Sequence, residues 1–145
     1  MRAKIKQNNP QQNQMQALLK NAGLRLTRQR ALLAELLFDN TDKHVSAEQL
    51  HQMVCTKGEH VALATVYNCL NQFCKTGLLR KIAINKNRTF FDTNIHSHQH
   101  FFDERTGHLS DIDGIQIDSS TLPPAPNGKK IGTVEVVVHL IDADS

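Results

Sequence analysis

The segment Ala62–Lys75 reads ALATVYNCLNQFCK and is followed from Leu78 by two short strand-like runs, and this combination decides the fold. Its apolar side chains recur at positions i, i+3, i+4 and i+7, which is the spacing of a helix that buries one face. These side chains are Val66, Cys69, Leu70 and Phe73. Gly77 ends the predicted helix, because glycine readily adopts the left-handed conformation that closes a last turn.

A β-hairpin is predicted directly after this helix. The runs Leu78–Ile84 and Arg88–Asp92 are strand-like, and turn-prone asparagines occupy the three residues between them. Three helices are predicted upstream, over about 11–22, 27–38 and 46–58, with Thr27 and Ser46 as N-cap residues. Helices that end in a hairpin form a winged helix, in which the last helix is the DNA-recognition helix.

The pattern of the chain changes after Asn94. His100–Phe102 and His108–Ile112 read as strands around a turn, and Ile131–Ile141 has the strongest strand pattern. So small a sheet does not stand alone, and its apolar face predicts a homodimer or a higher oligomer. We expect an α+β protein with a winged-helix DNA-binding domain over 1–93, including a mobile tail at 1–10, and a small α/β dimerisation domain over 94–145.

The net charge of +3 is unevenly distributed. Residues 1–90 hold 14 Lys and Arg against five Asp and Glu, whereas residues 91–145 hold three against nine. A basic half favours a polyanion such as DNA, and an acidic half with several histidines favours a cation. The sequence has no apolar run long enough for a membrane and no secretory signal pattern, so we expect a cytoplasmic protein without a membrane partner.

The polar face of the Ala62–Lys75 helix carries side chains that can read DNA. Hydroxyl and amide groups reach base edges in the major groove, and a tyrosine ring packs on a thymine methyl. The candidates are Thr65, Tyr67, Asn68, Asn71 and Gln72. Basic residues around this helix are candidate phosphate contacts, although an ordinary solvated surface explains each of them as well. They are Arg25, Arg28, Arg30, Arg80, Lys81, Lys86 and Arg88.

The run from His96 to His100 alternates histidine with polar residues. In an extended strand, His96, His98 and His100 project to the same side. Imidazole with nearby carboxylates suits iron, manganese or zinc, and no soft ligand selects copper(I). On spacing alone, a solvated histidine-rich loop explains the run equally well.

Three segments resemble the ferric uptake regulator (Fur) family of metal-responsive transcription regulators. They are Ala22–Arg30 (AGLRLTRQR), His44–Glu48 (HVSAE) and Leu63–Asn68 (LATVYN), and the resemblance covers about residues 15–141. It implies operator DNA as the partner, with Arg25 in the minor groove and Tyr67 on the bases. Asn68 stands where many members carry arginine.

The same resemblance implies one regulatory site for a divalent metal, Fe, Mn or Zn. Its ligands would be His44, Asp92, His98, His100 and Asp111. Such a site takes ligands from both predicted domains, so its occupancy would set the angle between them and the match to two DNA half-sites.

Cysteine usage departs from the family pattern. Asp103 and Thr106 stand where a CxxC pair would fall, so no structural four-cysteine zinc is expected. This loss, together with the proline-rich segment Leu122–Pro126, resembles the iron response regulator (Irr) branch, whose members sense haem. The resemblance implies a repressor of haem synthesis and iron-using genes that is active at low iron and inactivated by haem. The haem ligands would be His96, His98 and His100.

Two alternatives stay open. The same ligand set resembles the peroxide-sensing branch of the family, in which bound Fe(II) reacts with peroxide and a ligand histidine is oxidised. A metal-dependent hydrolase belongs to a different class, and an open metal position can activate water. Because neither a general base nor a glycine-rich substrate loop is evident beside the histidine run, we expect a regulator and not an enzyme.

Overall fold

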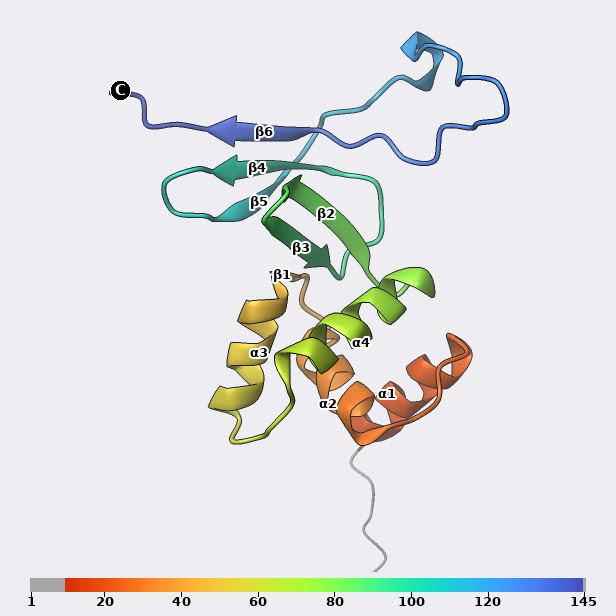
Figure 1. Ribbon diagram of the computed structural model, residues 1–145, viewed down its shortest axis with the longest axis vertical. Coiled ribbons are helices and arrows are strands. Elements are labelled where there is room, and N and C mark those ends of the chain that lie inside the picture. Colours follow the sequence, from red (N-terminus) through yellow and green to blue (C-terminus); the bar gives the residue numbers. More distant parts are fainter. Residues whose placement is uncertain (1–9, 145) are drawn as a thin grey trace, which may run out of the picture. The chain divides into compact units, whose positions relative to one another are not determined.

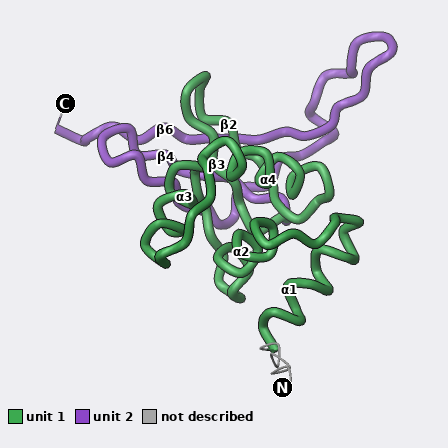
Figure 2. The backbone as a smooth tube through the Cα atoms, turned by 60° about the horizontal axis from the view of Figure 1, so that its bottom comes forward, with its two compact units in different colours: residues 1–95 green, residues 96–145 purple. Residues whose placement is uncertain are grey.

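The computed structural model describes residues 10–144. It divides into two compact units, coloured separately in Figure 2: unit 1 ends at Ile95 and unit 2 begins at His96. The predicted mobile tail lies outside the described residues except for Pro10, which is the first residue of a helix and suits that position because it needs no amide hydrogen there.

Unit 1 is built from helices and one small antiparallel sheet (Figure 1). Its helices are α1 (Pro10–Asn21), α2 (Arg28–Leu37), α3 (Ala47–Thr56) and α4 (Leu63–Lys75). Its strands are β1 (His44–Val45), β2 (Arg80–Asn85) and β3 (Arg88–Asp92), in the order β1-β3-β2. The predicted helices and hairpin are therefore present, and β2–β3 follows α4 as the wing.

Both predicted N-caps of unit 1 are confirmed. The Thr27 hydroxyl accepts a hydrogen bond from the Arg30 amide at 3.2 Å and begins α2. Ser46 begins α3 with a reciprocal pair, because its hydroxyl accepts from the Gln49 amide at 3.1 Å while the Gln49 side chain accepts from the Ser46 amide at 2.9 Å. These bonds satisfy amides that the first turn of a helix leaves without partners.

One apolar cluster holds the helices of unit 1 together. The predicted inward face of α4 is fully or almost fully buried, and Phe91 on the wing joins the same cluster. Burial of a side chain as large as phenylalanine stabilises the fold by about 1.5–3 kcal/mol. The packing therefore fixes the wing against the helices and leaves the polar face of α4 exposed.

Unit 2 is a three-stranded sheet with a short 3-10 helix, η1 (Ser119–Thr121). Its strands are β4 (Gln99–Asp103), β5 (Leu109–Ile112) and β6 (Val137–Leu140), in the order β5-β4-β6. The strand β4 pairs antiparallel with β5 and parallel with β6. This mixed sheet and the helical unit 1 agree with the expected α+β class.

Two predictions about strands are wrong in extent, and one strand is not predicted at all. The run Ile131–Ile141 forms a strand only at β6; just before it, the side-chain oxygen of Gln99 accepts the Val136 amide hydrogen at 2.5 Å, so this amide is used outside the sheet ladder. The wing turn is shorter than expected, because Asn85 pairs with Arg88 after a register shift. The strand β1 was not predicted, since two residues are too few for a periodic pattern.

Candidate metal centre and DNA-contact face

His44 and Asp92 form the candidate ligand pair of unit 1. They are register partners across β1 and β3, and the His44 Nε2 atom lies 3.2 Å from Asp92 Oδ2. The other carboxylate oxygen of Asp92 accepts the Asn94 amide hydrogen at 2.8 Å. Next to the pair, Lys43 and Thr93 exchange two hydrogen bonds, at 2.9 and 3.0 Å, that hold the two strands in register.

The Asp92 side chain is 0% exposed. A fully buried carboxylate is stable only with positive charge or several hydrogen bonds beside it. The arrangement of Asp92 opposite an imidazole nitrogen is therefore suited to a cation, either a proton on His44 or a metal ion.

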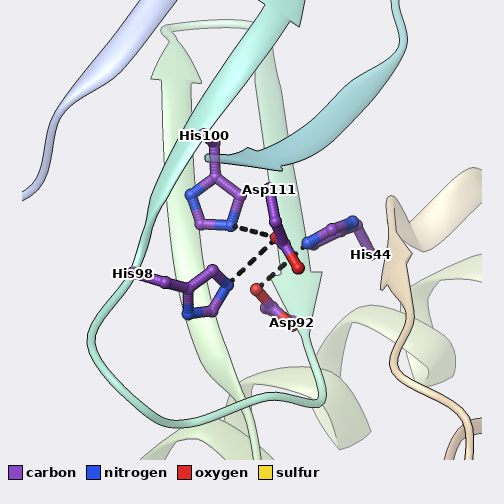
Figure 3. Close-up of side chains that lie close together, drawn as sticks. All are labelled: His44, Asp92, His98, His100 and Asp111. Carbon is purple, nitrogen blue, oxygen red and sulfur yellow. Dashed lines mark ion pairs between the residues drawn. The ribbon is translucent and has the colours of Figure 1, made fainter. Parts of the chain in front are cut away.

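His98, His100 and Asp111 form the candidate ligand triad of unit 2, and Figure 3 shows both this triad and the pair of unit 1. His100 and Asp111 are register partners across β4 and β5, and His98 lies just before β4. The Asp111 Oδ1 atom lies 3.2 Å from His98 Nε2 and 3.3 Å from His100 Nε2. The ligand atoms of the triad all lie within 4.8 Å of one another.

The hydrogen bond of His98 indicates which of its nitrogens can bind a metal. The Nδ1 atom lies 2.6 Å from the backbone carbonyl oxygen of His96, and a carbonyl oxygen only accepts. Nδ1 therefore carries a hydrogen, and Nε2 faces the carboxylate of Asp111 at 3.2 Å. A cation suits the space between this nitrogen and the carboxylate oxygen. This is the usual arrangement of a metal-binding histidine whose second nitrogen is held by the protein.

His96 contacts the triad with its backbone carbonyl, which accepts the hydrogen bond from His98, and not with its imidazole. Its side chain is exposed, and its ring is not among the grouped ligand atoms of the described residues. The structure thus brings two of the three expected haem ligands, His98 and His100, next to Asp111, with His100 almost fully buried.

The polar face of α4 presents Tyr67, whose side chain is 38% exposed. Its hydroxyl donates a hydrogen bond of 2.6 Å to the Glu48 carboxylate, at the start of α3. The bond raises the pKa of Tyr67 and lowers the pKa of Glu48, because it favours the protonated phenol and the ionised carboxylate. Thr65 and Asn68 lie on the same helix, half-buried and exposed respectively.

The predicted basic contacts of unit 1 differ in their surroundings. Arg25 is exposed in the segment between α1 and α2. Arg28 forms an exposed ion pair with Glu59 at 3.0 Å through one of its guanidinium nitrogens. Lys81 on the wing lies 5.8 Å from the centre of the Phe91 ring.

Sequence reasoning missed two contacts on this face. Glu48 carries no signal that relates it to Tyr67, and the polar side chain of Gln72 gives no sign that it accepts hydrogen bonds from Arg30. Arg30 was expected at a phosphate and Gln72 at a base edge, but both are engaged with each other. Such contacts join helices distant in sequence, so only the fold reveals them.

Comparisons with known proteins identify the class as metal-responsive transcriptional regulators. The model of the Ferric uptake regulator family matches residues 21–139. The peroxide-responsive repressor PerR of Staphylococcus epidermidis is 30% identical over 102 residues, which are 70% of this chain and 67% of that protein. The ferric uptake regulation protein of Yersinia pestis is 35% identical over 102 residues, 70% of this chain and 69% of that protein.

Solved structures agree on the fold. The ferric uptake regulator from Pseudomonas aeruginosa with manganese superposes with a TM-score of 0.65 at 24% identity, covering 89% of this chain and 98% of that one.

The chain belongs to the ferric uptake regulator family. It is accordingly a metal-responsive transcriptional regulator and not an enzyme, which excludes the hydrolase alternative. Among the described residues, none of the helices could span a bilayer.

Proposed function

We propose that the chain is a cytoplasmic repressor whose affinity for operator DNA is controlled by one divalent ion, Fe, Mn or Zn. The ion would take ligands from the pair of unit 1 and from the triad of unit 2. The residues are His44, Asp92, His98, His100 and Asp111. The observation that carries the proposal is that both groups direct imidazole Nε2 atoms at carboxylate oxygens, at 3.2–3.3 Å.

The donor count supports a shared ion. The pair of unit 1 supplies two donor residues and the triad supplies three. Divalent transition metals in proteins take four to six ligands, so neither group is sufficient without help from water or from the other. The mixture of imidazole and carboxylate suits Fe, Mn and Zn alike.

Because the proposed ligands come from two units, the bound ion can control DNA binding. When bound, the ion neutralises the carboxylates and favours the arrangement of units in which both groups can reach it. In a homodimer, that arrangement sets the distance between two α4 helices and thus their match to two half-sites. We assign DNA contacts to Arg25, Arg28, Thr65, Tyr67, Asn68 and Lys81.

A finer proposal places the chain in the Irr branch, with haem as the signal and His96, His98 and His100 as its ligands. It is supported by the histidine run and by Asp103 and Thr106 in place of a CxxC pair. Haem would compete for the imidazoles of the triad, so DNA binding would be lost when haem is bound.

A second candidate is a peroxide-responsive repressor, which is favoured by the similarity to the Staphylococcus epidermidis protein. In that case, peroxide treatment of the iron-loaded protein would add one oxygen to His44 or His98. Peptide mass spectrometry detects this addition, and an unmodified pair of histidines would contradict it.

Operator binding in defined ligand states tests these proposals. A duplex is first selected from a random library by the full chain with Mn(II), and its affinity is then measured by fluorescence anisotropy with Mn(II), with EDTA and with haem. We expect EDTA to weaken binding about tenfold or more, within the usual range of coupling between two ligands. Equal affinity with Mn(II) and EDTA would contradict metal control, and unchanged binding with haem would contradict the Irr proposal.

A further inference from the structure

The guanidinium of Arg30, on α2, joins two segments that carry proposed DNA contacts. Its Nε and Nη2 atoms donate to the Gln72 side-chain oxygen on α4, at 3.1 and 2.7 Å. Its Nη1 atom donates to the backbone carbonyl of Arg25 at 2.7 Å. We call these three contacts the Arg30 bridge.

The Arg30 bridge uses a fixed positive charge with neutral partners. In the described part of the chain, residues 10–144, Arg30 forms no ion pair with a carboxylate, unlike Arg28 on the same helix. Its charge is therefore available to attract phosphates while its geometry is held by hydrogen bonds. The three contacts come from three nitrogens of a rigid, planar guanidinium, whereas all the donors of lysine lie on one nitrogen, so lysine does not reproduce them.

Without the Arg30 bridge, the backbone at Arg25 has few constraints. Residues 24–27 have no regular secondary structure, and Arg25 and Leu26 are exposed. The segment is fixed at its start by the turn at Gly23, where φ is 77° and the Leu24 amide donates to the Leu19 carbonyl. It is fixed at its end by the Thr27 cap. Between these points, the Arg30 contact is the hydrogen bond that the structure shows on the Arg25 carbonyl.

We propose that Arg30 is a positioning residue for DNA recognition, which holds the backbone of Arg25 at a fixed place relative to helix α4. The inference rests on the proposed DNA-binding function. Arg25 and α4 then meet one half-site together, because their relative position is set before binding and little entropy is lost in ordering the segment. The affinity contributed by Arg25 therefore depends on Arg30 and Gln72.

A double-mutant cycle tests this dependence. The probe is the duplex selected with Mn(II), and the full chain is measured as wild type, Arg25→Ala, Arg30→Lys and the double variant. We expect Arg25→Ala to weaken binding about tenfold in the wild type and about twofold in the Arg30→Lys background. Independent effects, with a tenfold loss in both backgrounds, would overturn the proposal.

Two further variants separate positioning from general stability. Gln72→Met keeps the length of the side chain and removes the acceptor, so it should reduce the effect of Arg25→Ala as Arg30→Lys does. Arg105→Lys makes the same chemical change in an exposed ion pair of unit 2 and should leave the cycle unchanged. A response to Arg105→Lys as large as the response to Arg30→Lys would overturn the assignment.

A measurement without DNA tests whether the Arg30 bridge makes the backbone of Arg25 rigid, even if the DNA-binding proposal fails. The ¹⁵N order parameter of the Arg25 amide reports how rigid its backbone is in the free protein. We expect about 0.85 in the wild type and a value below about 0.6 in Arg30→Lys and Gln72→Met. Equal rigidity in all three proteins would overturn the Arg30 bridge, whereas a wild type that selects no duplex would contradict the proposed function instead.

Discussion

His44 and Asp92 lie directly opposite each other in the β1–β3 ladder, with 3.2 Å between His44 Nε2 and Asp92 Oδ2. The strand β1 is only two residues long, and it places a histidine from before α3 against the last residue of the wing. Unit 1 thus contains a histidine–carboxylate pair that is held by backbone hydrogen bonds, with the carboxylate fully buried.

Replacement of Asp92 by asparagine tests the role of its charge. The substituted side chain keeps an oxygen for the Asn94 amide, so the local backbone should be retained. We expect the affinity for Mn(II) to fall about 100-fold or more, because a carboxylate ligand is lost from the proposed site. Competition with a fluorescent chelator measures this affinity. Asp113→Asn is the matched control, and equal affinities of the two variants would contradict the assignment.

Tyr67 offers a spectroscopic test of its contact with Glu48. The chain has one tyrosine and no tryptophan, so the ultraviolet absorbance of the phenolate reports Tyr67 alone. The Glu48 carboxylate raises the pKa of Tyr67, since ionisation of the phenol would break a hydrogen bond and create a second negative charge. Glu48→Gln should therefore lower the midpoint of the titration toward 10. Glu35→Gln should not, and an unchanged midpoint in Glu48→Gln would show that the contact is absent in solution.

The capping box at Ser46 should stabilise the helix that follows the His44 strand. Ser46→Ala removes the acceptor for the Gln49 amide, and we expect a loss of about 1 kcal/mol in the free energy of unfolding. Ser46→Asp keeps a capping oxygen and should lose much less. Urea denaturation measures both, and a loss in Ser46→Asp equal to that in Ser46→Ala would exclude capping as the cause.

Asp39 makes a contribution to stability that depends on pH. Hydrogen bonds from Lys43 and Thr41 lower its pKa from 3.8 to about 2. Because the folded value is the lower one, the contribution is present above pH 3.8 and is lost as the pH falls toward 2. The difference in stability between wild type and Asp39→Asn should therefore shrink over this range. A difference that stays constant with pH would contradict the shift.

Much of unit 1 could be predicted because its signals are local. The inward face of α4 follows from helical spacing, and the caps at Thr27 and Ser46 follow from residue type and position. The strand β1 could not be predicted, since it exists only through its pairing with β3. In unit 2, β6 begins only at Val137, and the Val136 amide is bonded to the side chain of Gln99, a contact that strand propensity does not register.

The candidate site, too, could be predicted from the sequence only in part. The strand spacing of His98 and His100 is visible in the sequence, and the fold places both beside Asp111. The choice of His44 and Asp92 rested on family resemblance, because no local pattern relates them. The hydrogen bond from His98 to the His96 carbonyl, which leaves Nε2 to face Asp111, depends on a loop conformation that spacing cannot give.

We propose that one ion takes ligands from both units and thereby controls DNA binding. The operator affinity of His44→Ala and His98→Ala, each measured with Mn(II) and with EDTA beside the wild type, tests this proposal. We expect each single variant to lose the response to Mn(II) and to bind as the wild type does in EDTA. A full response to Mn(II) in either variant would contradict it.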